Sequence, residues 1–144
     1  KQAALGGGLT PAMSVSAPII AVRTLMPGEG TGYGHTFVAQ EAMRIGIIGV
    51  GYSNYFPRSL SNRGVVCAGG ARARVLGRVS MEMTATDLSG APHLGVGDTV
   101  WLLGGPYETA VTPEELAAQW GTISYEVFCL LGSNARRYER PEKR

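Results

Sequence analysis

The chain has 144 residues, of which 44% are hydrophobic and 17% are charged, and its formal net charge is +2. These values exclude a disordered chain and give no charge-based reason to expect nucleic acid as a partner. The length suits about one domain with its own core. No run of eighteen apolar residues occurs, so we expect no membrane span in this segment.

The two cysteines, Cys67 and Cys129, lie far apart in apolar sequence. This arrangement favours two buried free thiols in a reducing compartment over a disulfide framework. No secretory signal pattern is visible in the first residues, and we therefore expect a cytoplasmic protein.

In chain order, residues 1–15 contain Gly6, Gly7, Gly8 and Pro11 and are predicted to be a linker or a truncated N-terminal boundary. A strand is predicted over Ala17–Leu25, ending at Pro27-Gly28. The next segment, Gly28–Gly34, alternates glycine with other residues and carries Tyr33. Such a glycine cluster indicates positive φ angles or a close backbone approach.

Short apolar runs separated by turn residues follow, and their spacing is typical of a β-barrel or a sandwich. The predicted strands are Thr36–Ala39, Arg44–Val50, Val65–Cys67, Arg72–Val79, Met81–Leu88 and Thr99–Leu103. Turns are predicted at Ser61–Gly64 and, as a hairpin, at Ala68–Ala71. In a strand, Glu82 would face away from Met81 and Met83, which alone would be interpreted as core residues.

The C-terminal part is predicted to be helical. Thr112 supplies an N-cap, Pro113 suits the first helical position, and Glu115 completes a capping-box pattern before a helix over Leu116–Trp120. A second helix, Tyr125–Leu131, follows, and residues 139–144 form a charged tail. The predicted fold class is therefore mainly β, with one or two short helices near the C-terminus.

Several familiar site patterns are absent or incomplete. The run Ile48–Gly51 lacks the third glycine of a dinucleotide fingerprint, because position 54 is Asn. No G-x-S-x-G nucleophile motif is present. Metal-ligand spacing is not found among His35, His93, Cys67 and Cys129. On composition alone, each tyrosine is more typical of a packing residue than of a catalyst.

Taken in order, five motifs resemble the C-terminal domain of alanine racemase, over residues 16–138. They are Gly32–Thr36, Gly51-Tyr52 leading to Pro57-Arg58, Ser61–Gly64, Gly77–Met81 and Tyr125-Glu126. The resemblance implies a Greek-key-like β-barrel domain that follows an N-terminal (β/α)8 barrel of the same protein. It also implies a homodimer that interconverts L- and D-alanine by a two-base lysine and tyrosine mechanism, supplying D-alanine for peptidoglycan.

In that family the N-terminal barrel carries the lysine that holds pyridoxal 5'-phosphate. The lysines of this chain are Lys1 and Lys143, at its polar extremes, where no desolvated pocket is expected. We therefore expect the chain to be inactive without the barrel.

The resemblance assigns roles residue by residue. Tyr33 corresponds to the catalytic tyrosine, which in the family extends into the partner subunit's pocket. Because a free phenol has a pKa of about 10, this role at neutral pH needs a neighbouring positive charge or hydrogen bond. Met81 corresponds to the residue whose backbone N–H meets the substrate carboxylate, and Tyr125 to a ligand of the cofactor phosphate, at a helix start that suits an anion. The entrance-corridor positions are Tyr52, Arg58, Arg78 and Ile123.

The chain departs from the family pattern at two places. Glu82 stands where the family usually has Asp, and Ser53–Phe56 replaces a common Ala-Asp-Gly-Tyr/Trp run. Alternatives left open are the C-terminal domain of a serine or broad-specificity racemase, and a non-catalytic β-barrel binding module that shares only the fold.

Overall fold

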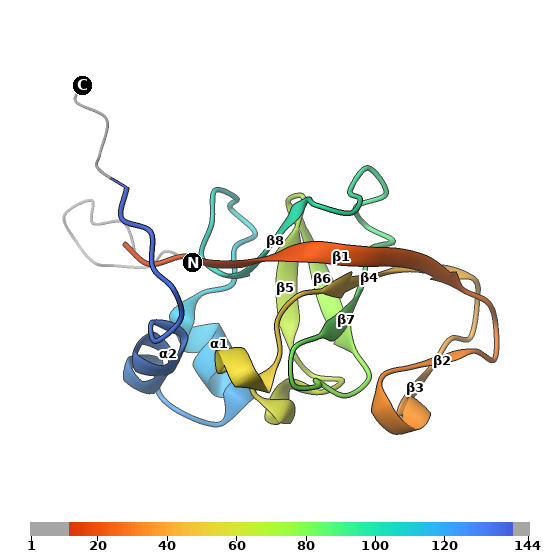
Figure 1. Cartoon of the computed structure of the whole chain (residues 1–144), viewed down its shortest axis with the longest axis horizontal. Helices are drawn as coiled ribbons and strands as arrows, with labels where there is room; N and C mark the ends of the chain where they lie inside the picture. Colours follow the sequence, from red (N-terminus) through yellow and green to blue (C-terminus); the bar gives the residue numbers. More distant parts are fainter. Residues whose placement is uncertain (1–11, 140–144) are drawn as a thin grey trace.

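The computed structural model describes residues 12–139, which form a β-barrel with two helices at one end (Figure 1). Six antiparallel strands close the barrel in the order β1-β4-β7-β6-β5-β8. They are β1 (Val15–Leu25), β4 (Met43–Ile48), β5 (Val65–Ala68), β6 (Ala71–Leu76), β7 (Thr84–Asp87) and β8 (Thr99–Leu103). The remaining elements are the hairpin β2 (Gly30–Thr31) and β3 (Phe37–Val38), the 3-10 turns η1 (Tyr33–His35), η2 (Tyr52–Asn54) and η3 (Arg58–Leu60), and the helices α1 (Pro113–Trp120) and α2 (Ser124–Leu131).

The strand order is that of a Greek key. Strands β5, β6 and β7 form a meander, and β8 returns to lie beside β5, which gives the spatial order fourth, first, second, third. Strand β1 closes the barrel because its first residues pair with β8 and its later residues pair with β4. The predicted mainly β, Greek-key-like barrel is confirmed.

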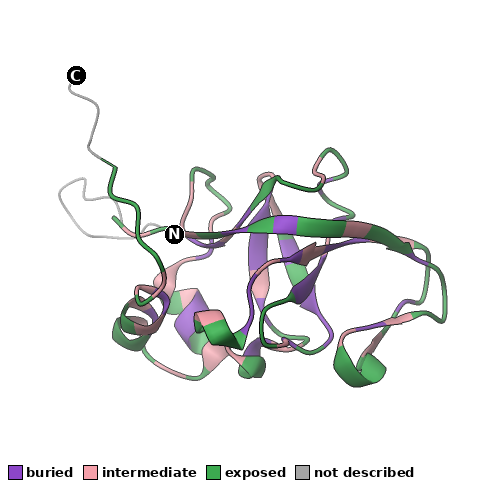
Figure 2. Cartoon of the chain, in the orientation of Figure 1, coloured by how far each residue is buried: buried purple, intermediate pink, exposed green. Residues whose placement is uncertain are grey.

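The core fills the barrel and continues under the two helices. Along β6, Ala73 and Val75 are buried while Arg72 and Arg74 are exposed, as the two-residue period of a strand requires. Figure 2 shows buried residues on the barrel strands and exposed residues over the β2–β3 loop. Helices α1 and α2 add their buried residues to the same cluster: Leu116, Ala117, Val127 and Leu131. Full burial of a valine or leucine side chain contributes about 1.5–3 kcal/mol.

Local sequence signals explain two of the elements. Gly69 and Gly70 both have positive φ, 59° and 83°, in the two-residue turn between β5 and β6, which confirms the predicted hairpin. The Thr112 side chain accepts a hydrogen bond from the Glu115 N–H at 3.2 Å, which confirms the predicted N-cap of α1. The Glu115 carboxylate pairs with Arg72.

Other predictions need correction. The predicted strand Met81–Leu88 is wrong in its first part, because β7 begins only at Thr84. Met81, Glu82 and Met83 are all exposed in a bend, so neither a core role for the methionines nor an alternation with Glu82 holds. Strand β6 stops at Leu76, because Gly77 has a φ of 71°.

The two cysteines also differ from each other. Cys67 is buried as predicted, whereas Cys129 is exposed on α2, so the prediction of two buried thiols is wrong for Cys129. Residues 1–11 and 140–144, which include most of the predicted linker and charged tail, lie outside the described residues. No helix within residues 12–139 has the length and apolar character that crossing a bilayer requires.

Candidate functional site

The Tyr33 loop has the unusual backbone that its glycines predicted. Gly32, Gly34 and His35 have φ angles of 79°, 74° and 48°, so three of the four residues from Gly32 to His35 are left-handed. The Tyr33 side chain is 78% exposed, and its hydroxyl has no hydrogen-bond partner within residues 12–139. The His35 ring lies against the Gly30 backbone, where an added Cβ would be only 2.7 Å from the His35 Cβ.

The loop rests directly on the turn that ends β6. A Cβ on Gly32 would lie 2.8 Å from the Arg78 backbone nitrogen, and a Cβ on Gly77 would lie 2.6 Å from the Thr31 carbonyl oxygen. Both contacts are backbone to backbone, so neither position tolerates a side chain without displacing the other segment. The hairpin β2–β3 is thereby held against the β6–β7 loop.

A second close contact joins the β6–β7 loop to the segment after β4. The Tyr52 N–H donates to the Ser80 carbonyl at 3.0 Å, and the Ser53 N–H donates to the Met81 carbonyl at 2.9 Å. A Cβ on Gly51 would lie 2.0 Å from the Ser80 oxygen. Glycine at position 51 is therefore what lets Tyr52 and Met81 lie side by side.

The turn Ser61–Gly64 ties these loops together, a function that its turn-like sequence did not reveal. The Ser61 hydroxyl accepts from the Val79 N–H at 2.9 Å and donates to the Arg58 carbonyl at 2.6 Å. The Asn62 Oδ1 atom accepts from the Gly77 N–H at 2.7 Å, and its Nδ2 atom donates to the Thr36 Oγ1 atom at 3.2 Å. The only sequence signal was a Ser-Asn pair, whose short polar side chains commonly bond to nearby backbone.

These contacts bring five of the seven predicted site residues onto one set of joined loops, and all five are exposed. They are Tyr33, Tyr52, Arg58, Arg78 and Met81. Within residues 12–139, neither Arg58 nor Arg78 forms an ion pair, since the pairs found there are Arg72–Glu115, Arg74–Asp87 and Arg137–Glu139. The two guanidinium groups are therefore free to attract anions, and the exposed Glu82 beside Met81 carries the opposite charge on the same loops.

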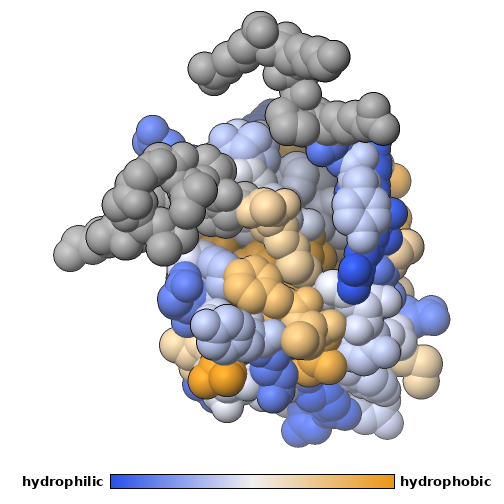
Figure 3. Space-filling model, turned by 90° about the vertical axis from the view of Figure 1, so that its left-hand side faces the viewer, coloured by the Kyte–Doolittle hydropathy of each residue, from blue (hydrophilic) through white to orange (hydrophobic). Residues whose placement is uncertain are grey.

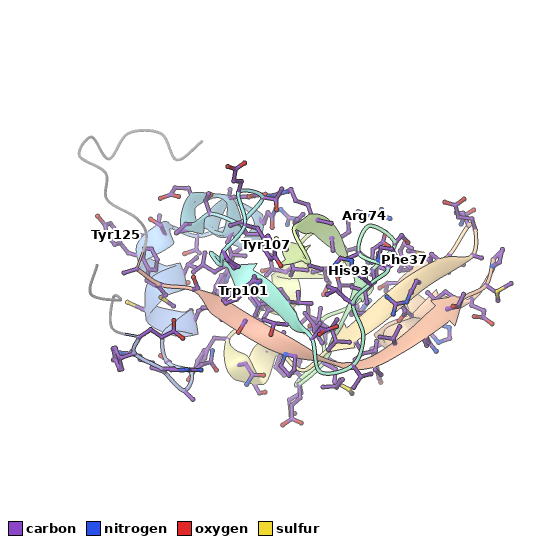
Figure 4. The ribbon with its side chains drawn as sticks, turned by 90° about the horizontal axis from the view of Figure 1, so that it is seen from above. Phe37, Arg74, His93, Trp101, Tyr107 and Tyr125 are labelled. Atoms are coloured by element: carbon purple, nitrogen blue, oxygen red, sulfur yellow. The ribbon has the colours of Figure 1, made fainter. Side chains whose placement is uncertain are left out.

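The other two predicted residues, Ile123 and Tyr125, lie at the start of α2. Figure 1 shows α2 at one end of the molecule and the β2–β3 hairpin at the other, and in Figure 4 Tyr125 lies at the α2 end, far from Phe37 of β3. The catalytic candidate Tyr33 and the phosphate-ligand candidate Tyr125 are thus separated by the barrel.

The start of α2 suits a phosphate group. Ile123 is the N-cap residue and provides no side-chain cap, and the Glu126 N–H donates to the Ile123 carbonyl at 3.1 Å. Among the described residues, the Ser124 and Tyr125 N–H groups have no such acceptor, and the Tyr125 side chain is 76% exposed. The Glu126 carboxylate lies in the same turn. The described residues at this helix start fit the phosphate end of pyridoxal phosphate. Because both lysines lie outside residues 12–139, the described residues offer no lysine for the cofactor's carbonyl carbon.

Residues 12–139 contain no group of three or more His, Cys, Asp or Glu side chains that could hold a metal ion.

Comparison with known proteins decides the family. The profile for "Alanine racemase, C-terminal domain" matches residues 12–139. The chain belongs to this family. Alanine racemase from Nitratidesulfovibrio vulgaris (strain DP4) is 52% identical over 134 residues, which are 93% of this chain and 36% of that protein. Alanine racemase from Lawsonia intracellularis is 44% identical over 92% of this chain and 35% of its own length.

Solved structures agree with the sequence relatives. The biosynthetic alanine racemase of Pseudomonas aeruginosa superposes with a TM-score of 0.82 at 40% identity, over 92% of this chain and 36% of that chain. The enzyme of Bartonella henselae, solved with covalently bound pyridoxal phosphate, gives a TM-score of 0.74 at 28% identity, over 82% of this chain and 32% of that chain. The chain thus spans about a third of the length of these alanine racemases and corresponds to their C-terminal domain.

Proposed function

We propose that this chain is the C-terminal part of a pyridoxal-phosphate-dependent racemase that interconverts L- and D-alanine. The observation that carries the proposal is the joining of three separate loops by backbone contacts at Gly32, Gly51 and Gly77, which gathers exposed Tyr33, Arg78 and Met81 beside one another. A binding module with no reaction to perform has no need for that arrangement.

When bound, pyridoxal phosphate withdraws electrons from the amino acid's Cα atom and makes its proton acidic. On one face of Cα, the Tyr33 side chain would accept that proton as a phenolate or return a proton as a phenol. The lysine of the N-terminal barrel, which is neither Lys1 nor Lys143, would serve the other face. The Met81 N–H donates to the substrate carboxylate, and the Tyr125 hydroxyl donates to the cofactor phosphate. Tyr52, Arg58, Arg78 and Ile123 line the entrance, where the two guanidinium groups attract the carboxylate.

The separation of Tyr33 from Tyr125 supports a homodimer. Because these side chains lie at opposite ends of the barrel, they serve two different pockets: Tyr125 serves its own subunit, and Tyr33 reaches the partner's. A twofold dimer makes both pockets complete at once.

An apolar surface supports an N-terminal domain as the second partner. Figure 3 shows apolar side chains gathered on the end of the molecule that carries α2 and the start of β1, where Met13, Val15 and Phe128 are only partly buried against the core. About two thirds of each relative's length lies outside the matched segment, and a domain that precedes β1 would cover this surface. The chain alone is then inactive, and the complete enzyme works in the cytoplasm and supplies D-alanine for peptidoglycan.

The test is Tyr33→Phe in the complete protein, read as exchange of the Cα proton of L- and D-alanine with deuterated solvent. Loss of a positioned acid or base costs about 10²–10⁴-fold, so we expect a loss of that order for one enantiomer and a much smaller loss for the other. Tyr107→Phe is the matched control, because Tyr107 is also exposed but packs against Gly70 at the β5–β6 turn. Equal, small losses for both enantiomers would refute the role of Tyr33.

A further inference from the structure

Tyr33 is exposed on a loop whose own hydrogen bonding is slight. Within η1 the His35 N–H donates to the Gly32 carbonyl at 3.2 Å, a long contact, and no residue of the turn is buried. A loop of this kind samples several positions unless another segment holds it. A proton-transfer group must instead be held close to one geometry.

The segment that holds the loop is the turn containing Asn62. The Asn62 backbone and side chain together make two hydrogen bonds with Gly77, since the Asn62 N–H donates to the Gly77 carbonyl at 3.0 Å and its Oδ1 atom accepts from the Gly77 N–H at 2.7 Å. These bonds fix Asn62 on the end of β6. Its remaining donor, Nδ2, reaches Thr36, the residue that ends η1.

The position suits asparagine on two grounds. Its φ of 55° lies in the left-handed region, which Asn tolerates better than most residues. Its amide also offers an acceptor and a donor on one short side chain, which an aliphatic residue cannot do. Alanine or leucine would lose both side-chain bonds, to the Gly77 N–H and to Thr36, and would keep only the backbone bond to the Gly77 carbonyl.

We propose that Asn62, acting through Thr36, is a positioning residue for Tyr33: it ties the Tyr33 loop to the end of β6. This inference rests on the proposed function, because it assigns the link a role in proton transfer. Asn62 itself touches neither substrate nor cofactor.

The test compares Thr36→Val, which removes only the hydroxyl acceptor, with Thr36→Ser, which keeps it. Asn62→Gly serves as a second variant, because glycine accepts the positive φ while losing both side-chain bonds. Loop order is measured in the complete protein by amide hydrogen exchange of a peptide covering residues 32–37. In Thr36→Val, loss of one net hydrogen bond corresponds to about a threefold to tenfold faster exchange. Asn62→Gly loses two side-chain bonds and should exchange at least as fast, whereas Thr36→Ser should stay within about twofold of the parent protein.

The second readout is Cα-proton exchange for each enantiomer, with Tyr33→Phe measured alongside. We expect Thr36→Val and Asn62→Gly to slow the same enantiomer that Tyr33→Phe slows, with the other enantiomer spared and Thr36→Ser close to normal. If Cα-proton exchange slows equally for both enantiomers and Tm falls in parallel, the Asn62–Thr36 hydrogen bond contributes to stability alone, and the inference is overturned. If Tyr33→Phe is selective but Thr36→Val changes neither loop exchange nor selectivity, the inference fails while the proposed function stands. If Tyr33→Phe shows no selectivity, both fail.

Discussion

Replacement of Gly51 by alanine should destabilise the protein through a steric clash of the added Cβ and not through backbone strain. Gly51 has φ −157° and ψ −160°, an extended conformation that alanine adopts freely, so no backbone penalty arises. The new Cβ, however, would lie 2.0 Å from the Ser80 oxygen and 2.5 Å from the Met81 carbonyl carbon. Both are backbone atoms, and neither can rotate away.

The two segments must therefore separate, and the bonds from the Tyr52 and Ser53 N–H groups to the β6–β7 loop are lost. Two net hydrogen bonds at about 1 kcal/mol each, together with loosened packing, give a cost of roughly 2–4 kcal/mol. For a chain of this size that lowers Tm by roughly 4–16 °C.

Thermal unfolding followed by circular dichroism measures the change, with Gly95→Ala as the control. Gly95 has no atom within 4 Å of an added Cβ and no positive φ, so its replacement should shift Tm by little. A Gly51→Ala protein as stable as the parent would refute the steric reasoning and show that the β6–β7 loop is not held where the contact places it.

Two further outcomes are expected. The first mixes two variants of the complete enzyme, one carrying Tyr33→Phe and the other Tyr125→Ala. The mixture should recover about a quarter of the parent racemase activity, because half of randomly mixed dimers are hybrids and each hybrid has one intact pocket of two. No recovery after verified subunit exchange would mean that both tyrosines serve the same subunit's pocket. In this 144-residue chain, a maleimide should label the exposed Cys129 in the native state and Cys67 only after denaturation, as counted by mass spectrometry; labelling of both thiols at equal rates would contradict the burial of Cys67.

The sequence predicted those parts of the fold that local chemistry determines. The Gly69-Gly70 hairpin and the Thr112 cap follow from residues within a few positions of each other, and both form as expected. Cys129 was misplaced because α2 buries only one side. Val127 and Leu131 are a helical turn apart and face the core, and Cys129 is about 200° around the helix from Val127.

The bend at Met81–Met83 could not be found from local pattern. Alternation of Met81 and Met83 with Glu82 is typical of a strand, but the Ser80 N–H and hydroxyl both donate to the Met83 carbonyl and close a turn. The N–H groups of Tyr52 and Ser53, nearly thirty residues earlier, bind the Ser80 and Met81 carbonyls. The same limit applies to the site: motif resemblance named Tyr33 and Met81, but the way Asn62 joins their loops depends on contacts between distant segments.

The turn at Ser53–Phe56, where the sequence differs from the family pattern, is held by contacts with other segments. Tyr55 occupies a left-handed position, with φ 64°, where the family pattern has glycine, and Asn54 supplies an acceptor for the Gly51 N–H at 3.3 Å where the pattern has an acid. A left-handed tyrosine costs about 1–2 kcal/mol. Contacts on both sides of Tyr55 hold the turn: Gly51 packs against the Ser80 and Met81 backbone, and the Asn54 carbonyl accepts a hydrogen bond from the Asn134 Nδ2 atom at 2.8 Å. The segment exposes Tyr55 and Tyr52, each by 42%, and has the neutral Asn54 where the family pattern has an acid. The exposed acid on the joined loops is Glu82, beside Met81. We expect any difference in substrate preference from the family pattern to arise from side-chain bulk and charge at this proposed entrance, because Gly32 and Gly77, which hold the Tyr33 loop, lie outside the replaced segment.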